Sequence, residues 1–404
     1  MNSIKHLLLV GASALALADS ASADTVIHIA GSNGDRAATT QAILNLLTSP
    51  VYKAGIAGSA TASNFSIITG SFNGTSVIVK TAFIGATGGI KAVASTNASE
   101  KLVRFLPDNA TGTSNPNPLT TTDPTKYETS APDFGVSTNF QSTSPYQDTY
   151  NGVFYTTLTD TITGVVPLNF VASKNFPGDN LTTSNAQALY LRGAVPLAFF
   201  TGSSADRNKT VFAIGRNTDA GQRYGAFAEI GIGVNAVVKQ YQPTISSGVV
   251  TSHVLWPVET VSGVSSQFAG NSGYSSGALV ATALTATLSS TAYQVGNPSA
   301  TAGYYVGYVT PSDATTAVAG GAVLLKWNGV PYSSTAVAEG QYTAWLYTHV
   351  LYDPDLTGFV KDFADALATE VSNNTIVSPG GGLQLSTLQV RRNSEGALIT
   401  AKYF

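Results

Sequence analysis

Residues 209–231 read KTVFAIGRNTDAGQRYGAFAEIG, and the order of residue types in this stretch decides the fold. The apolar run KTVFAI predicts a buried strand, the polar run GRNTDAGQ predicts a turn, and the alanine-rich run RYGAFAEI predicts a helix. The same order recurs at 25–48 and at 75–95. Strands that alternate with helices through short glycine turns are typical of α/β folds. The sequence therefore predicts an α/β protein.

Length and composition limit the kind of protein further. The chain has 404 residues, enough for two lobes with separate cores, and its 43% hydrophobic content is that of a globular protein. Only 11% of the residues are charged, against about 25% in typical globular domains. The net charge of -3 gives no overall field that would attract nucleic acid or an anionic membrane. Any anion-binding site must therefore be local.

The first 23 residues have the pattern of a secretory signal peptide. A basic start (MNSIKH) precedes an apolar run (LLLVGASALALA), and Ala21-Ser22-Ala23 forms an A-x-A cleavage site. We therefore predict a periplasmic or extracellular location, with no membrane span in the mature chain. The absence of cysteine excludes disulfides, thiolate metal sites, cysteine nucleophiles and a lipid-modified cysteine.

Two later segments are predicted as helices from their apolar spacing and their ends. Residues 182–193 begin with Thr and Ser residues suited to an N-cap and end at Gly193, a suitable C-cap. Residues 353–371 form the clearest amphipathic helix, because apolar residues recur there at a spacing of four. These residues are Phe359, Phe363 and Leu367.

The middle of the chain changes in composition. Residues 109–150 are rich in Pro, Thr and Ser and predict a long surface loop or inter-lobe segment, with a short strand near 133–136. The apolar run GVVPLNFVAS at 164–173 then predicts a further strand. No fixed-period repeat of the solenoid kind is found.

Glycine turns that lead into helices could bind an anion. The first N–H groups of a helix have no intrahelical acceptor, and the helix dipole favours negative charge at that end. Arg36 and Arg223 stand at two such helix starts, and Arg216 lies in the turn before one of them. The guanidinium fork suits a tetrahedral oxyanion. The adjacent Asp35 and Asp219 could accept a proton from the anion, cap a helix or neutralise an arginine.

A serine-hydrolase alternative rests on residues 273–277, GYSSG, which match G-x-S-x-G. His349 and Asp313 would be its base and acid. The motif requires a preceding strand, and the polar run SSQFAGNS does not predict one. We therefore interpret the motif as a serine- and glycine-rich helix start.

Metal and cofactor sites are not indicated by the sequence. The mature chain has three histidines, His28, His253 and His349, and their separations match no paired-ligand pattern. We expect no catalytic residue, no metal and no cofactor.

Several segments, in chain order, resemble the phosphate-binding proteins of bacterial phosphate importers, which have the type 2 periplasmic-binding fold. The strongest is 182–223, which resembles the family's helix, strand and R-x-x-x-S-G-T segment. AGSNGDR, FIGATGGIKAV and PDFGVST resemble the first ligand turn, the G-S-S-G-G turn with its helix, and the D-F-G-x-S-D segment. GYSSGALV and YYVGYVTPSDA resemble the later glycine helix and strand.

This resemblance implies a two-lobed fold, each lobe a mixed sheet flanked by helices, with a ligand cleft between the lobes. Residues 24–160 together with 310–404 would form one lobe, and 161–309 the other. The implied function is non-catalytic binding of a small oxyanion, with phosphate the first candidate and an ABC permease as partner. The ligand-binding residues carried over are Ser32, Asp35, Arg36, Thr87, Thr138, Arg216, Gly221, Gln222 and Arg223.

The chain departs from the family pattern at the positions that should bind the anion. Ala220 and Gln222 replace the serine and threonine of S-G-T, and Ala86 replaces a serine beside Thr87. The family's ligand aspartate falls at Thr138, or at Asn139 with a one-residue shift. Three functions follow as alternatives: phosphate binding, binding of a changed ligand, or a cell-surface structural or interaction role with a weakened site.

Overall fold

The computed structural model describes residues 24–256, 260–261, 264–265, 272–373 and 381–402. The predicted signal peptide lies outside these residues. Within them, no helix has both the length and the apolar character that crossing a membrane requires.

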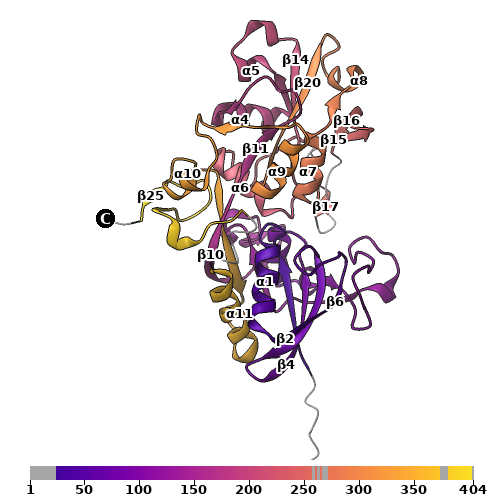
Figure 1. Ribbon diagram of the computed structural model, residues 1–404, viewed down its shortest axis with the longest axis vertical. Helices are drawn as coiled ribbons and strands as arrows, with labels where there is room; N and C mark the ends of the chain where they lie inside the picture. Colours follow the sequence, from indigo (N-terminus) through magenta and orange to yellow (C-terminus); the bar gives the residue numbers. More distant parts are fainter. Residues whose placement is uncertain (1–23, 257–259, 262–263, 266–271, 374–380, 403–404) are drawn as a thin grey trace, which may run out of the picture.

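The first of two lobes is built on a seven-stranded mixed sheet (Figure 1). Its core strands β1, β4 and β7 are parallel, and β23 runs antiparallel to its two neighbours, β7 and β10, at one side. In sheet order the strands are β10 (Thr159–Pro167), β23 (Trp345–Tyr352), β7 (Phe134–Ser137), β1 (Thr25–Gly31), β4 (Thr75–Ala82), β3 (Phe65–Phe72) and β2 (Thr48–Gly55).

Helices cover both faces of this sheet. Alternate residues of a strand point to opposite faces, so Ile27 and Ile29 pack in the core with α1 (Arg36–Leu46) and α11 (Gly358–Val371). Ala30 packs on the other face with Ala92 of α2 (Ala86–Ala94). The predicted face of the C-terminal helix is confirmed, since Phe363 and Leu367 are buried and Phe359 packs against the same core.

The second lobe has a five-stranded mixed sheet, also with helices on both faces. Val211 and Ala213 pack toward α4 (Thr183–Arg192) and α6 (Gly221–Glu229), whereas Phe212 and Ile214 pack toward α7 (Gly277–Leu284) and α9 (Pro311–Ala319). The sheet order is β13 (Ala194–Pro196), β14 (Lys209–Ala213), β20 (Ala302–Val309), β11 (Asn169–Ala172) and β21 (Val323–Leu324). The predicted two-lobed α/β class is therefore confirmed.

Shorter elements complete the two lobes. In the first they are α3 (Ala98–Lys101), β5 (Val103–Phe105), β6 (Glu128–Ser130), β8 (Asp148–Tyr150) and β9 (Val153–Tyr155). Those after β11 are β12 (Asn180–Leu181), α5 (Ala198–Thr201), β15 (Tyr241–Ser246), β16 (Val249–Leu255), β17 (Thr260–Val261), β18 (Val264–Ser265), β19 (Thr287–Leu288), α8 (Ser290–Tyr293), β22 (Lys326–Trp327), α10 (Ser334–Ala338), β24 (Val390–Arg391) and β25 (Thr400–Ala401).

The chain crosses between the sheets twice. The run predicted as one strand at 164–173 is two strands, because β10 ends in the first sheet and β11 begins in the second, separated by Leu168 alone. The chain returns to the first sheet at β23. The lobe limits at 160 and 310 stay a prediction, and the pairing of β21 with β11 argues for a return later than 310.

A C-terminal segment contacts both lobes and reinforces the crossing. Leu383 pairs with Val165 of β10, and Glu395 accepts a hydrogen bond from the Phe140 N–H of the first lobe. In the second lobe, Arg392 forms a buried ion pair of 3.0 Å with Glu229 of α6. This segment therefore restrains the two lobes relative to each other.

The α11 face offers a test of the first core. Phe363 is fully buried and its ring centre lies 5.0 Å from that of Phe72. Phe363→Ala should lower the free energy of unfolding by about 3–5 kcal/mol, because it leaves a cavity in packed surroundings. Denaturant unfolding measures this loss. Phe154→Ala, at a ring residue that is 53% exposed, is the control and should change stability by about 0.5 kcal/mol or less.

Candidate functional site

The candidate site lies where the loops that follow β1, β4 and β7 reach the second lobe. Because these three strands are parallel, their carboxyl ends meet at one edge of the sheet, where ligands bind in open α/β sheets. The loop after β1 carries Ser32, and the loop after β7 carries Thr138. The Ser32 hydroxyl donates to the Thr138 hydroxyl at 3.2 Å and accepts from the Gly34 N–H at 2.9 Å. Both hydroxyl residues are buried.

The start of α6 packs directly against these loops from the second lobe. A Cβ atom on Gly221 would lie 2.6 Å from Thr138 Oγ1 and 2.4 Å from Asn139 Oδ1. A Cβ atom on Gly34 would lie 2.7 Å from Gln222 Nε2. No larger residue fits at either glycine without displacing its neighbours. The lobes are therefore in contact at this point.

A second contact joins the lobes at the start of α2. The Thr87 N–H donates to the Asp219 carbonyl at 3.0 Å, and Gly85, at a φ of 115°, lies against the same carbonyl. The Thr87 hydroxyl is buried and has no hydrogen-bond partner within the described part of the chain. The Thr87 backbone therefore contacts the second lobe, and its role as a ligand residue stays a prediction.

Arg216 is a buried cation fixed by three protein oxygens. Its Nε donates to the Tyr274 carbonyl at 3.1 Å, its NH2 to the Ser275 carbonyl at 3.0 Å, and its NH1 to Gln222 Oε1 at 2.7 Å. Burial lowers the pKa of Arg216 to about 10, so the guanidinium stays charged at neutral pH. The Gln222 carboxamide thus connects the guanidinium to the Ser32–Gly34 turn.

The other two predicted arginines have different surroundings. Arg223 lies behind the turn, where its NH1 donates to the Arg216 carbonyl at 2.9 Å and its guanidinium lies 5.1 Å from the Phe227 ring centre. Arg36 donates to the Thr61 carbonyl and to Asn64 Oδ1 in its own lobe. Arg36 therefore makes no hydrogen bond to the other predicted ligand residues among those the structure describes.

Asp35 is buried at the start of α1, and its side chain does not cap the helix. Burial raises the pKa of Asp35 from 3.8 to about 7. Its Oδ1 atom has no hydrogen-bond partner in the described residues. Asp35, Gly34 and Thr348 line a small cavity of about 30 Å³ beside the crossing strands. This carboxyl group therefore lies beside the strands that join the lobes.

The hydrolase alternative is not supported by the pairing of its residues. His349 Nδ1 pairs with Asp160 at 2.8 Å, and Asp313 accepts a hydrogen bond from Thr310. The stretch 273–277 has another use, since the carbonyls of Tyr274 and Ser275 hold Arg216. Sequence reasoning singled out this stretch but missed that role, because any residue type supplies a backbone carbonyl.

Comparisons with known proteins find phosphate-binding proteins. No family model matches the chain. The phosphate-binding protein PstS of Bacillus subtilis (strain 168) is 32% identical over 72 residues, which are 18% of this chain and 24% of that protein. The chain therefore matches about a quarter of the length of this curated relative.

Three solved structures are similar over nearly all of their length. They are a putative phosphate ABC transporter substrate-binding protein with bound phosphate from Clostridium perfringens, an ABC-type phosphate transport receptor from Vibrio cholerae, and PstS from Borrelia burgdorferi. The TM-scores are 0.45, 0.47 and 0.40, and the identities 14%, 12% and 12%. Each comparison covers 89% of this chain and 99–100% of the other.

The buried Asp35 gives a prediction for pH dependence. The folded pKa of about 7 exceeds the reference value of 3.8, so the folded state binds more protons between these values. The free energy of unfolding should therefore fall as pH rises from about 4 to about 7, by up to about 1.4 kcal/mol per pH unit. Asp35→Asn should remove this part of the pH dependence and raise stability at pH 8.

Denaturant unfolding at pH 5 and pH 8 measures both values. Asp355→Asn, the same substitution at an exposed carboxylate, serves as the control. An Asp35→Asn protein with the wild-type pH dependence would contradict the assignment.

Proposed function

We propose that the protein is an exported, non-catalytic solute-binding protein that holds phosphate or a related oxyanion between its lobes. The observation that carries this proposal is the position of Gln222. Its carboxamide oxygen accepts from the buried Arg216, and its amide nitrogen lies against the turn that carries Ser32. An oxyanion in place of this carboxamide would meet the guanidinium, two hydroxyl groups and the first N–H groups of α6.

The same geometry predicts how the length of the side chain at position 222 affects the affinity for phosphate. The Gln222 oxygen already accepts one charge-assisted hydrogen bond from Arg216 at 2.7 Å. An entering anion must displace the carboxamide and give up that bond first. We therefore expect a weaker affinity for phosphate than a threonine at this position would allow.

A periplasmic or extracellular location and a permease of the ABC class as partner belong to the same proposal. The location rests on the signal-peptide pattern of residues 1–23, and the partner rests on the resemblance to importer proteins. Coexpression and copurification with a permease encoded beside this gene would test the partner.

A second candidate is a cell-surface structural or interaction role on the same scaffold. It is favoured by the direct bond between the Thr87 N–H and the Asp219 carbonyl, which joins the two lobes. Three Arg216 hydrogen bonds are likewise made to protein oxygens. If the folded, ligand-free protein binds neither phosphate nor sulfate, that result favours this second role.

Arg216 is the first residue to change. Calorimetric titration should detect phosphate binding by the wild type, and Arg216→Lys should weaken it about tenfold or more, because lysine lacks the planar fork. Near-UV circular dichroism establishes that the variant remains folded. Arg207→Lys, at an exposed position, is the matched control. Equal phosphate affinity in Arg216→Lys and wild type would place the anion elsewhere.

Gln222→Thr tests the competing carboxamide. It removes the group that occupies Arg216 and introduces a hydroxyl, so phosphate affinity should rise relative to wild type. Gln187→Thr, at a half-buried glutamine of α4, is the control for the same substitution outside the site. A fall in affinity in Gln222→Thr would mean that the glutamine itself contacts the ligand.

A further inference from the structure

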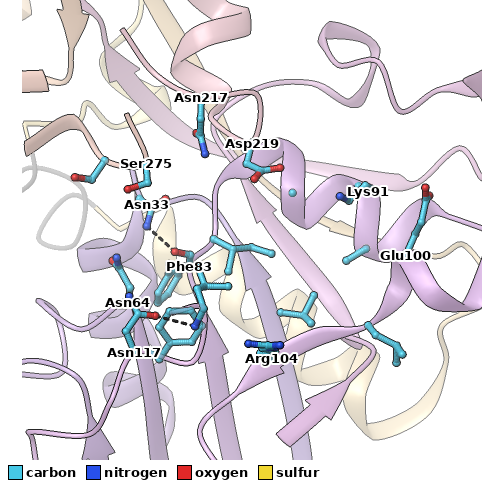
Figure 2. A pocket seen from close by; sticks show the side chains of 18 of the residues that line it. Asn33, Asn64, Phe83, Lys91, Glu100, Arg104, Asn117, Asn217, Asp219 and Ser275 are labelled. Carbon is cyan, nitrogen blue, oxygen red and sulfur yellow. Dashed lines mark hydrogen bonds between the residues drawn. The ribbon is translucent and has the colours of Figure 1, made fainter. Parts of the chain in front are cut away.

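A larger cavity of about 820 Å³ lies beside the turn that carries Arg216 and is lined by residues of both lobes (Figure 2). Residues of the first lobe form most of its wall, and Asn217, Asp219, Ser275 and Ser276 line it from the second lobe. None of Ser32, Thr138, Arg216 or Gln222 lines it. Small-molecule sites measure about 300–1,000 Å³. The cavity therefore has room for a ligand that need not touch the oxyanion site.

Three asparagines of the first lobe give this cavity an excess of hydrogen-bond donors. The side-chain oxygen of Asn97 accepts from the Ser99 N–H, that of Asn117 from the Leu119 N–H, and that of Asn64 from the Arg36 guanidinium. A backbone N–H and a guanidinium can only donate, so these bonds fix which end of each amide is oxygen.

The amide nitrogens of the three asparagines remain available to a ligand. No hydrogen bond engages them within the described part of the chain. Each amide offers two N–H donors. The three residues line one cavity and call for a ligand with several acceptor oxygens.

Two cations line the same cavity. Lys91 has no carboxylate within 4.0 Å among the described residues, and its Nζ lies 5.8 Å from the Tyr146 ring centre. Arg104 donates from NH1 to the carbonyls of Pro118 and Thr121 and stacks 4.0 Å from the Tyr127 ring centre. Its Nε and NH2 groups have no acceptor in the described residues. Both cations thus have donor groups that can meet an anionic ligand.

Two carboxylates, those of Glu100 and Asp219, line the same cavity and balance its two cations in charge, so the excess of hydrogen-bond donors comes from the three amides. Glu100 already accepts from the Ser95 hydroxyl at 2.9 Å and from the Tyr155 hydroxyl at 2.7 Å. The other acid, Asp219, lies on the second lobe. At the rim, Leu102 and Leu119 are 53% and 52% exposed. These apolar side chains can contact the carbon skeleton of an organic ligand.

We propose that this cavity is a ligand site for a polar organic anion larger than inorganic phosphate. Its carboxylate or phosphate oxygens accept hydrogen bonds from Asn64, Asn97 and Asn117 and pair with Lys91, while its carbon skeleton contacts Leu102 and Leu119. Because Asn217, Ser275 and Ser276 line the cavity from the second lobe, the ligand contacts both lobes. This proposal does not rest on oxyanion binding at Arg216, because the two sites share none of these residues.

Calorimetric titration at low salt with three probes tests the proposal. Digalacturonate supplies carboxylates, glucose 6-phosphate supplies a phosphate ester, and maltose is a neutral sugar. Binding of either anion in preference to maltose supports the site and identifies the anionic group. Binding of none of the three, or of maltose as tightly as the anions, overturns it. Inorganic phosphate should not displace the bound anion, and displacement would place that anion at the oxyanion site instead.

Asn97→Asp and Asn117→Asp are the decisive variants. Each keeps the oxygen that accepts from the protein backbone and replaces the outward amide donor by an acceptor. Each should weaken anion binding about tenfold or more, and so should Lys91→Gln. Asn297→Asp is the matched control, because its oxygen accepts from the Ser299 N–H in the same kind of turn away from the cavity. Wild-type affinity in both cavity variants would overturn the proposal.

Discussion

The hydrogen bonds of the buried Arg216 guanidinium are the interactions on which the contact between the lobes depends. A buried cation is stable only when its donors find acceptors, because desolvation otherwise costs several kcal/mol. The carbonyls of Tyr274 and Ser275 and the carboxamide of Gln222 supply these acceptors. The Arg216 carbonyl is held in turn by Arg223. These bonds fix the turn before α6. They therefore also fix the start of α6, which contacts the loops of the first lobe.

Glycine sets how closely the lobes approach. Gly34 and Gly221 leave no room for a side chain, and Gly85 lies against the Asp219 carbonyl. The lobes consequently touch at these glycines, and the larger cavity lies beside this contact. This contact contains Thr138, Gly221 and Gln222, three of the residues expected to bind phosphate. The cavity contains amides and cations from other segments of the chain. The two surfaces proposed to bind ligands are therefore neighbours but share no residue named for binding.

Local sequence predicted elements best where one pattern sufficed. The helix at 182–193 begins after Thr182 and ends at Gly193, whose φ of 82° suits glycine. The short strand near 133–136 is β7, shifted by one residue at each end. Apolar character alone does not show where the run at 164–173 divides. Its apolar character is the same on both sides of Leu168, and only the pairing partners divide it into β10 and β11.

The sequence by itself determined the alternation of strands and helices, the α/β class and the glycine turns before the helices, because these depend on near neighbours in the chain. The tertiary structure decided which charges meet. Arg36 and Arg223 both lie in the first turn of a helix, yet Arg36 donates to Asn64 in its own lobe and Arg223 donates to the Arg216 carbonyl. The donors around the larger cavity come from separate segments of the first lobe. Only the folding of that lobe brings such distant groups together, so no spacing within the sequence could have revealed them.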